Sequence, residues 1–328
     1  MERATTVSEL RRAVAAARGQ GLTIGLVPTL GALHEGHLAN VRTVVDDIGD
    51  DGFLVVSVFV NPLQFGPGED CEAYPRDLDG DAEILESLGP STPDLLYAPT
   101  VAEMYPGWPG DAGDDFTATS VHVESLTERL CGASRPGHFD GVATVVTKLL
   151  DQVRPDVAAF GRKDFQQLQV VRRLVTDLDL DLRILATPTV REAGGLAMSS
   201  RNAYLSEEER TAARCVPRAL SDAVRAAMKA RAAGERPDPN VLRDVALATI
   251  SAEPRARIDY VDVVDPVTLQ PPDQSPDQPP DQSGHDDGGE ARQLLVAVAV
   301  QVGPSRLIDN VVVGDEDDEQ RLLDATTG

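Results

Sequence analysis

LTIGLVPTLGALHEGHLANVR, residues 22–42, is the stretch that decides the fold. It begins with Leu22 to Val27, a short apolar run with β-branched residues, which is typical of a buried parallel strand. Pro28, Thr29 and Gly31 are expected to break this strand, because proline cannot donate to a strand ladder and glycine lets the chain turn. Apolar residues then recur at helical spacing from Leu38 to Val45. The stretch therefore predicts a strand that runs through a turn into a helix.

The predicted helix opens with two histidines, His34 and His37. A helix N-terminus has unsatisfied N–H groups and a partial positive charge, which favour bound phosphate. Residues three apart lie on one face of the first turn, where both imidazoles can donate hydrogen bonds to oxygens that gain charge in a transition state. Gly36 keeps side-chain bulk away from such a ligand. A capped helix start with two surface histidines explains the same tetrapeptide equally well, whereas a zinc site would need a third ligand that the neighbouring sequence lacks.

The composition limits the possible partners. The 328 residues can hold two domains. With 30 basic and 54 acidic residues, the formal net charge is −24, so neither nucleic acid nor an anionic membrane is expected as a partner. Three widely spaced cysteines form no CxxC pair, and no apolar run has the length of a membrane span or signal-peptide core. We therefore expect a soluble, cytoplasmic protein.

Further strands are predicted to alternate with helices after the opening motif. The expected strands are at 53–59, 94–97, 157–160 and 183–186, and the expected helices are at 5–18, up to Leu88, and at 142–153. This alternation predicts an α/β fold, a Rossmann-like doubly wound parallel sheet, over residues 1–188. Polar turns follow two of the strands, at 61–66 and 161–167, where ligands bind in open α/β sheets.

Residues 189–328 predict a smaller C-terminal α+β domain. One long helix is expected at 207–233, behind a capping box of Ser206 and Glu209. A second helix is expected at 239–251, and strands are expected at 258–264, 294–300 and 307–313. Residues 269–291 contain PPDQ-type repeats without aromatic or β-branched residues, so a disordered insertion is expected there. A proline-rich docking site is the alternative, although the flanking basic residues of such ligands are missing.

Three further segments carry groups that suit phosphate chemistry. Ser199, Ser200 and Arg201 suit a triphosphate, because arginine gives bidentate charge-assisted bonds that serine hydroxyls can complement. Lys163, at a strand-to-helix turn, is either a solvated lysine or a phosphate ligand. The loop at 135–141 is either a structural turn with Asp140 as a helix cap or part of the catalytic site.

Six motifs in order resemble the pantothenate synthetase (pantoate–β-alanine ligase) family over nearly the whole chain. They are VPTLGALHEGH at 27–37, SVFVNPLQF at 57–65, YPRDLDGD at 74–81, RPGHFDGVATVVTKL at 135–149, FGRKDFQQ at 160–167, and TPTVREAGGLAMSSRN at 187–202 with the YLS that follows. The HxGH-type element is similar to that of the wider nucleotidylyl transferase superfamily, whereas NPxQF and KDxQQ point to this one family.

This resemblance implies an ATP-dependent condensation of (R)-pantoate with β-alanine in pantothenate (vitamin B5) and coenzyme A biosynthesis. A pantoyl adenylate would form first, with release of pyrophosphate, and AMP would leave in the second step. It also implies Mg²⁺ bound through the ATP phosphates rather than by a cluster of side chains, and a homodimer in the cytoplasm. Two alternatives are a nucleotidylyl transferase that leaves the nucleotide on its product and a degenerate nucleotide-binding protein without turnover.

The resemblance also assigns residues to roles. Catalytic roles fall to His34, His37, Lys163 and Arg201. The residues implied around ATP are Pro28, Thr29, Leu30, His34, His37, Gly161, Arg162, Lys163, Asp164, Val190, Met198, Ser199, Ser200 and Arg201. Asn61, Gln64 and Gln167 would bind pantoate, and Tyr74 and Arg76 belong to a mobile loop that closes over the site. The chain departs from the usual family pattern at Leu30, Arg162 and Phe165, where methionine, glutamate and tyrosine are usual.

Overall fold

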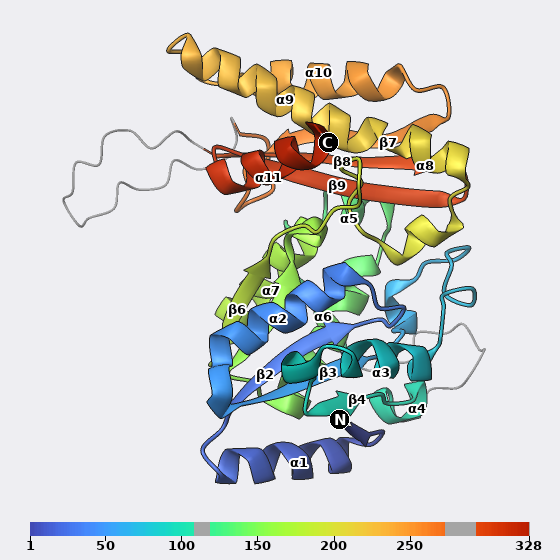
Figure 1. Ribbon diagram of the computed structural model, residues 1–328, viewed down its shortest axis with the longest axis vertical. Helices are drawn as coiled ribbons and strands as arrows, with labels where there is room; N and C mark the ends of the chain where they lie inside the picture. The colour runs from blue at the N-terminus through green and yellow to red at the C-terminus, as the bar shows by residue number, and fades with distance from the viewer. Residues whose placement is uncertain (108–118, 273–292, 328) are drawn as a thin grey trace, which may run out of the picture. The chain divides into compact units, whose positions relative to one another are not determined.

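The computed structural model describes residues 1–107, 119–272 and 293–327, which divide into two compact units (Figure 1). The first unit contains Met1–Thr127 and Arg135–Thr189, and the second contains Glu128–Ser134 and the described part of Val190–Gly328. The segment 128–134, which lies in the predicted first domain, thus belongs to the second unit. The assignment of 1–188 and 189–328 to two functional domains stays a prediction.

The first unit is built on a six-stranded sheet in which all neighbouring strands are parallel. Its order is β1-β4-β3-β2-β5-β6. The strands are β1 (Glu2–Ala4), β2 (Thr23–Thr29), β3 (Gly52–Val58), β4 (Leu95–Tyr97), β5 (Val157–Gly161) and β6 (Arg183–Thr187). The helices are α1 (Val7–Gly19), α2 (Glu35–Ile48), α3 (Leu78–Glu86), α4 (Val101–Met104), α6 (His138–Val153) and α7 (Phe165–Asp177). Short 3₁₀ turns are η1 (Gly49–Asp51), η2 (Pro62–Gln64), η3 (Gly89–Ser91) and η4 (Arg162–Asp164).

Both faces of this sheet are apolar, which explains why helices cover both. In the register of β2 with β3, Val27 lies beside Val56 and Leu26 lies beside Val55, so the two pairs point to opposite faces. Val27 and Val56 share a buried cluster with the apolar sides of α2 and α3. Helices α1, α6 and α7 pack beside β2 and β5, and Figure 1 shows helices on both sides of the sheet. The predicted doubly wound α/β fold is confirmed.

Strand β2 continues through Pro28 to Thr29, so the expectation that Pro28 ends the strand is wrong. Thr29 bonds toward β3, since its carbonyl accepts from the N–H of Phe59, and Pro28 therefore points toward β5. The pairing of β2 with β5 stops at Leu26. The missing N–H of Pro28 therefore removes no ladder hydrogen bond.

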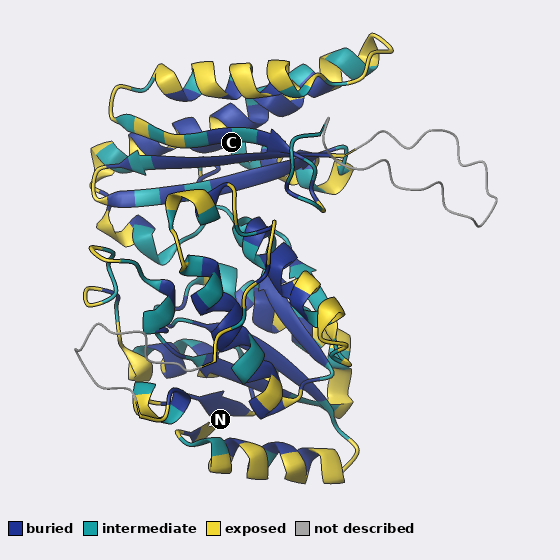
Figure 2. Ribbon diagram, turned by 180° about the vertical axis from the view of Figure 1, so that it is seen from behind, coloured by how far each residue is buried: buried dark blue, intermediate teal, exposed yellow. Residues whose placement is uncertain are grey.

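The second unit has a three-stranded antiparallel sheet in the order β7-β8-β9. Its strands are β7 (Ala256–Val264), β8 (Leu294–Val302) and β9 (Ser305–Val313). Its helices are α5 (Cys131–Ser134), α8 (Glu207–Ala213), α9 (Cys215–Ala232), α10 (Pro239–Ser251) and α11 (Glu316–Thr327), with a 3₁₀ turn η5 (Ser200–Tyr204). Alternate β8 residues form a core with α9 and α10. Figure 2 shows a buried side and an exposed side on the helices that cover this sheet, and the predicted α+β fold is confirmed.

Three features of the second unit differ from expectation. The single helix expected at 207–233 is two helices that meet at Arg214, because Pro217 in the first turn of α9 lacks an N–H and its ring would clash with the carbonyl of Ala213. Helix α11 was not predicted. Leu269, the first residue of the predicted insertion, is fully buried, whereas 273–291 lie outside the described residues. None of the helices described is long and apolar enough to cross a membrane.

Candidate functional site

Helix α2 begins with a reciprocal cap made by its own two histidines. The backbone N–H of Gly36 donates to Nδ1 of His34 at 3.1 Å, and the backbone N–H of His34 donates to Nδ1 of His37 at 3.2 Å. The two ring centroids are 4.1 Å apart. Because both Nδ1 atoms accept, the proton of each neutral imidazole is on Nε2. The pair therefore presents two N–H donors at the positive end of the helix.

His37 is neutral at physiological pH. Burial lowers its pKa from 6.5 to about 3, helped by His34 and Lys163 and opposed by the carboxylate of Asp164. Lys163 and Asp164 lie in η4, directly after β5, and the Nζ of Lys163 is 3.6 Å from Oδ1 of Asp164. The start of α2 and the turn after β5 thus bring four predicted site residues together: two neutral donors, one cation and one carboxylate.

The turn before His34 is held by Asp81 from α3. Its carboxylate accepts from the N–H of Leu33 at 2.7 Å and from that of Ala32 at 3.1 Å. Gly31 has a φ of +88°, and a Cβ there would lie 2.8 Å from an Asp81 oxygen, so glycine is required on both grounds. Burial raises the pKa of Asp81, although the two N–H groups oppose this. Asp81 therefore fixes the path of the chain from β2 into the histidine cap.

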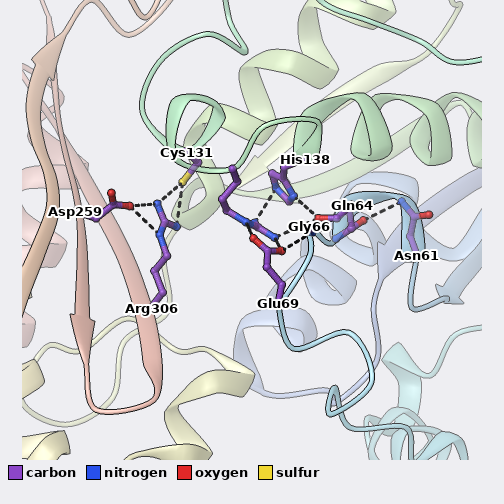
Figure 3. Close-up of polar contacts among 9 residues, drawn as sticks. Asn61, Gln64, Gly66, Glu69, Cys131, His138, Asp259 and Arg306 are labelled. Atoms are coloured by element: carbon purple, nitrogen blue, oxygen red, sulfur yellow. Dashed lines mark hydrogen bonds and ion pairs between the residues drawn. The ribbon is translucent and has the colours of Figure 1, made fainter. Parts of the chain in front are cut away.

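The side chain of Gln64, a predicted pantoate ligand, is held by that of Asn61, and Figure 3 shows the hydrogen bond between the two. The hydroxyl of Tyr105 donates to Oδ1 of Asn61 at 2.8 Å, which also accepts from the N–H of Leu63 at 3.3 Å. The Nδ2 of Asn61 must then donate, and it does so to Oε1 of Gln64 at 3.2 Å and to the carbonyl of Gly141 at 3.0 Å. Asn61 is 0% exposed. The remaining end of the Gln64 amide is its Nε2 donor.

The backbone of Gln64 is held by a second cluster, also drawn in Figure 3, from the 135–141 motif. Arg135 makes two bonds to the carboxylate of Glu69, at 2.7 and 2.5 Å, and donates to the carbonyl of Gln64 at 3.2 Å. Nδ1 of His138 lies 2.8 Å from the same carbonyl. Burial and the charge of Arg135 lower the pKa of His138 to about 4. The motif thus fixes the residue that we expect to meet the substrate.

Asp140, which one sequence interpretation made a helix cap, does not cap α6. The N-cap of that helix is Gly137, which has a left-handed backbone and makes no side-chain cap bond. Asp140 lies in the first turn, and its Oδ1 is 2.7 Å from Nδ1 of His122. The predicted structural turn is therefore present, but the carboxylate of Asp140 pairs with His122 instead of capping the helix.

The predicted mobile loop is held together by Arg76. Its guanidinium donates to the carbonyls of Cys71, Glu72 and Tyr74, at 2.7, 3.1 and 3.3 Å. The ring of Tyr74 is buried and packs edge-on against Phe65. A cavity of about 260 Å³ opens beside this loop at the carboxyl ends of β2, β3 and β4. It is lined by Leu30 and Arg76 but by neither histidine, so we base the site on the histidine cap rather than on this cavity.

In the second unit, Val190 and Met198 close a tight turn. The N–H of Met198 donates to the carbonyl of Val190 at 2.9 Å. Gly194 and Gly195 at the tip have φ angles of +89° and +88°, which glycine adopts without strain. Ser199, the next residue, caps η5 by accepting from the N–H of Arg201 at 3.3 Å. These contacts give the SSRN segment a defined backbone.

A buried ion pair supports this turn. Arg191 donates to both carboxylate oxygens of Asp309, at 2.6 and 3.0 Å, and to the carbonyl of Gly195 at 3.0 Å. The two side chains are 7% and 1% exposed. A neighbouring network has the Nδ2 of Asn202 donating to Oε1 of Glu192 at 2.7 Å. The backbone of the predicted ATP residues in this unit is thus held by an ion pair whose two members lie 118 residues apart in sequence.

The remaining predicted residues are placed as follows. Thr29 is buried at the end of β2, where its hydroxyl donates to the carbonyl of Ser57 at 2.8 Å. Gly161 ends β5, and Gln167 lies partly exposed in the first turn of α7. Arg162 lies close enough to Arg172 that its charge, after burial, helps to lower the pKa of Arg172. Within the described ranges, no group of three or more His, Cys, Asp or Glu residues could hold a metal ion.

Sequence reasoning missed Tyr105, Glu69 and Arg191 as supporting residues. Arg191 lies within the motif at 187–202, which was the available signal, whereas Glu69 lies between the motifs at 57–65 and 74–81. Tyr105 lies outside all six motifs, so nothing in the sequence pattern marked it.

Comparisons with known proteins identify the family that the chain resembles. Residues 2–312 match a family model described as pantoate-beta-alanine ligase. A pantothenate synthetase from Pelotomaculum thermopropionicum is 48% identical over 309 residues, which cover 94% of this chain and 98% of that protein. The crystal structure of pantothenate synthetase from Thermus thermophilus matches with a TM-score of 0.77 and 42% identity, over 95% of this chain and 99% of that one. A Francisella tularensis pantoate-beta-alanine ligase, solved with beta-gamma ATP and beta-alanine, matches with a TM-score of 0.67 and 27% identity, over 95% and 97%.

Proposed function

The chain belongs to the pantoate–β-alanine ligase family and is a ligase of pantothenate biosynthesis, and on that premise we propose an ATP-dependent route through a pantoyl adenylate. The carboxylate of (R)-pantoate attacks the α-phosphorus of ATP, and pyrophosphate leaves. The amine of β-alanine then attacks the acyl carbon, pantothenate forms and AMP leaves. The Francisella relative solved with beta-gamma ATP and beta-alanine supports this choice of substrates.

The single observation that carries the proposal is the histidine cap. His34 and His37 direct Nε2–H donors from a helix N-terminus, and the low pKa of His37 keeps it a neutral donor at working pH. Such donors stabilise the charge that grows on phosphate oxygens during adenylation. Lys163 beside them supplies the positive charge. This arrangement has no need of a covalent enzyme intermediate.

For pantoate, Gln64 is the direct ligand and Asn61 its positioning residue. Asn61 is fully buried and its amide is satisfied within the protein, so it acts through Gln64. Gln64 then offers Nε2–H donors, which suit the hydroxyl and carboxylate oxygens of pantoate. Gln167 is proposed as the second amide for the same substrate.

The second unit is proposed to hold the nucleotide with Ser199, Ser200 and Arg201, whose hydroxyls and guanidinium suit phosphates. Val190 and Met198 frame the nucleoside. Asp164 accepts from the ribose hydroxyls, and the loop with Tyr74 and Arg76 excludes water from the adenylate. The other residues assigned to ATP are Pro28, Thr29, Leu30, Gly161 and Arg162.

We further propose Mg²⁺ as the metal of the reaction, a homodimer as the assembly and the cytoplasm as the compartment. Mg²⁺ would bind through the oxygen atoms of the ATP phosphates, whose negative charge it would neutralise. The three cysteines take part in no disulfide in the described part of the chain, as suits a reducing compartment.

The test is pyrophosphate release from Mg·ATP and (R)-pantoate, with and without β-alanine, together with analysis for AMP and pantothenate. We expect pantothenate and AMP only when all three substrates are present. His37→Ala should lower adenylation by about 10²–10³-fold, while His122→Ala, which removes a histidine that pairs with Asp140 instead, should leave it unchanged. Nucleotide retained on the product would favour the nucleotidylyl transferase, and tight ATP binding without pyrophosphate release would favour the degenerate protein.

A further inference from the structure

Asn40 in helix α2 is a buried amide with an unsatisfied acceptor. The residue is 8% exposed, and its Oδ1 has no hydrogen-bond partner in the part of the chain that the structure describes. Most buried polar side-chain atoms in folded proteins have a partner, and leaving one without a partner lowers stability. Asn40 therefore offers a buried acceptor to which a bound molecule could donate.

The position of Asn40 connects it to the nucleotide site. It lies three residues after His37, on the same side of α2 and about 4.5 Å further from the helix start. Helix α2 packs on β5, whose last residue is Gly161. A Cβ built on Gly161 would meet Oδ1 of Asn40 at 4.0 Å and no other described heavy atom within that distance. The space beside Gly161 is therefore open, and the Asn40 acceptor borders it.

We infer that Oδ1 of Asn40 accepts a hydrogen bond from the nucleoside part of ATP. The inference rests on the proposed function, since it takes the phosphates to lie at the histidine cap. With the phosphates there, the nucleoside extends along α2 past His37 and over Gly161, which brings it to Asn40. A nucleoside has two kinds of donor that fit this acceptor, the ribose hydroxyls and the amino group of the base.

The Asn40 acceptor should affect the affinity for ATP and the preference for ATP over other nucleotides. Asn40 is proposed to meet the nucleoside and not the reacting phosphate, so it is a binding residue rather than a catalytic one. A donor that meets Oδ1 removes the cost of the unsatisfied atom, which makes ATP bind more tightly than an analogue without that donor.

The test compares ATP with three analogues by calorimetric binding, in the presence of Mg²⁺, to the full chain. The analogues are 2′-deoxy-ATP, 3′-deoxy-ATP and the purine riboside triphosphate that lacks the 6-amino group. We expect the analogue that lacks the donor for Asn40 to bind about tenfold more weakly than ATP, which corresponds to about 1.4 kcal/mol. Asn40→Ala should bind ATP about tenfold more weakly and should no longer distinguish that analogue from ATP, because the coupling between the two groups is lost. The analogue that Asn40→Ala no longer distinguishes from ATP tells whether the ribose or the base supplies the donor to Asn40, because a loss that remains in this variant comes from another residue such as Asp164.

Asn40→Leu is the second variant, which keeps apolar packing if the alanine variant is unstable, and it should behave in the same way. Thr43→Val is the matched control one turn further along α2, where the hydroxyl donates to the carbonyl of Ala39. It should retain the native preference. Equal binding of all four nucleotides to the native protein, or the native preference in Asn40→Ala and Asn40→Leu, would overturn the inference while pyrophosphate release leaves the proposed function intact. No binding of Mg·ATP to the native protein would instead refute the proposed function.

Discussion

Replacing Tyr105 by phenylalanine should weaken pantoate binding although Tyr105 is not proposed to touch pantoate. The substitution removes the 2.8 Å bond to Oδ1 of Asn61 and leaves that buried oxygen only the 3.3 Å bond from Leu63. A buried acceptor that loses its main donor costs about 1–3 kcal/mol. Losing this bond lowers the stability of the folded protein. It also lets the Asn61 side chain leave the orientation that fixes the Gln64 amide.

If about 1 kcal/mol of that cost appears in substrate binding, KM for pantoate rises about fivefold. The KM for ATP should not change, because the hydrogen bonds from Tyr105 lead to Gln64 and not to the histidine cap. The assay is steady-state pyrophosphate release with each substrate varied in turn. A purely structural defect would lower the yield of active protein without separating the two KM values.

Tyr97→Phe is the matched control in the same unit. Tyr97 is fully buried, and its hydroxyl donates to Oε1 of Gln152 at 3.1 Å, so it loses a similar bond to a side-chain amide. We expect a similar fall in stability and an unchanged KM for pantoate. An unchanged pantoate KM in Tyr105→Phe, or an equal rise in Tyr97→Phe, would refute the proposed relay.

Three other predictions concern stability. The pKa of His37 is about 3 in the native protein and 6.5 ordinarily, so between these pH values the unfolded state binds a proton that the native state does not, and the free energy of unfolding should fall as pH falls from 6.5 to 3. His37→Asn should make this fall shallower in urea unfolding. An unchanged dependence of the unfolding free energy on pH would contradict the assignment. Asp81→Ala leaves two N–H groups without their acceptor and should cost about 2–4 kcal/mol in the same assay, whereas Asp79→Ala, which removes an exposed ion pair, should cost under about 0.5 kcal/mol. Arg191→Met leaves the buried carboxylate of Asp309 without its partner and should lower the free energy of unfolding by about 3–5 kcal/mol. The double variant with Asp309→Leu should recover part of this stability, and no recovery would mean that loss of the ion pair is not the cause.

The strands and their order along the chain could be predicted because their cause is local. The run at 157–160 is buried on both faces of a parallel sheet, so it consists almost wholly of apolar residues, and β5 forms there. Three-residue β1 has too few residues to show a period, and it forms through its pairing with β4 some 90 residues later. Pro217 was a signal in the sequence for the break between α8 and α9, but the Ala-rich helical pattern on both sides of it favoured one continuous helix.

The supports of the site could not be predicted, because their partners are far apart in sequence. Tyr105 meets Asn61 across 44 residues, Arg135 meets Glu69 across 66, and Arg191 meets Asp309 across 118. A motif marks the residue types that are needed, but it does not show which carboxylate pairs with which guanidinium. Only the fold brings such groups to hydrogen-bond distance.

The helix cap made by His34 and His37 is present in the structure, whereas their role as phosphate donors stays a proposal. A capped helix start and a pair of phosphate donors were separate explanations of His34 and His37. In the structure each Nδ1 accepts a backbone N–H, and that bond leaves the proton on Nε2. The cap therefore directs both Nε2–H donors outward. Both imidazoles stay neutral, and for His37 this agrees with its low pKa, which burial causes because a buried charge is unfavourable. Replacing His37 by glutamine, which can accept at the cap and still donate, should accordingly retain more adenylation activity than replacing it by alanine.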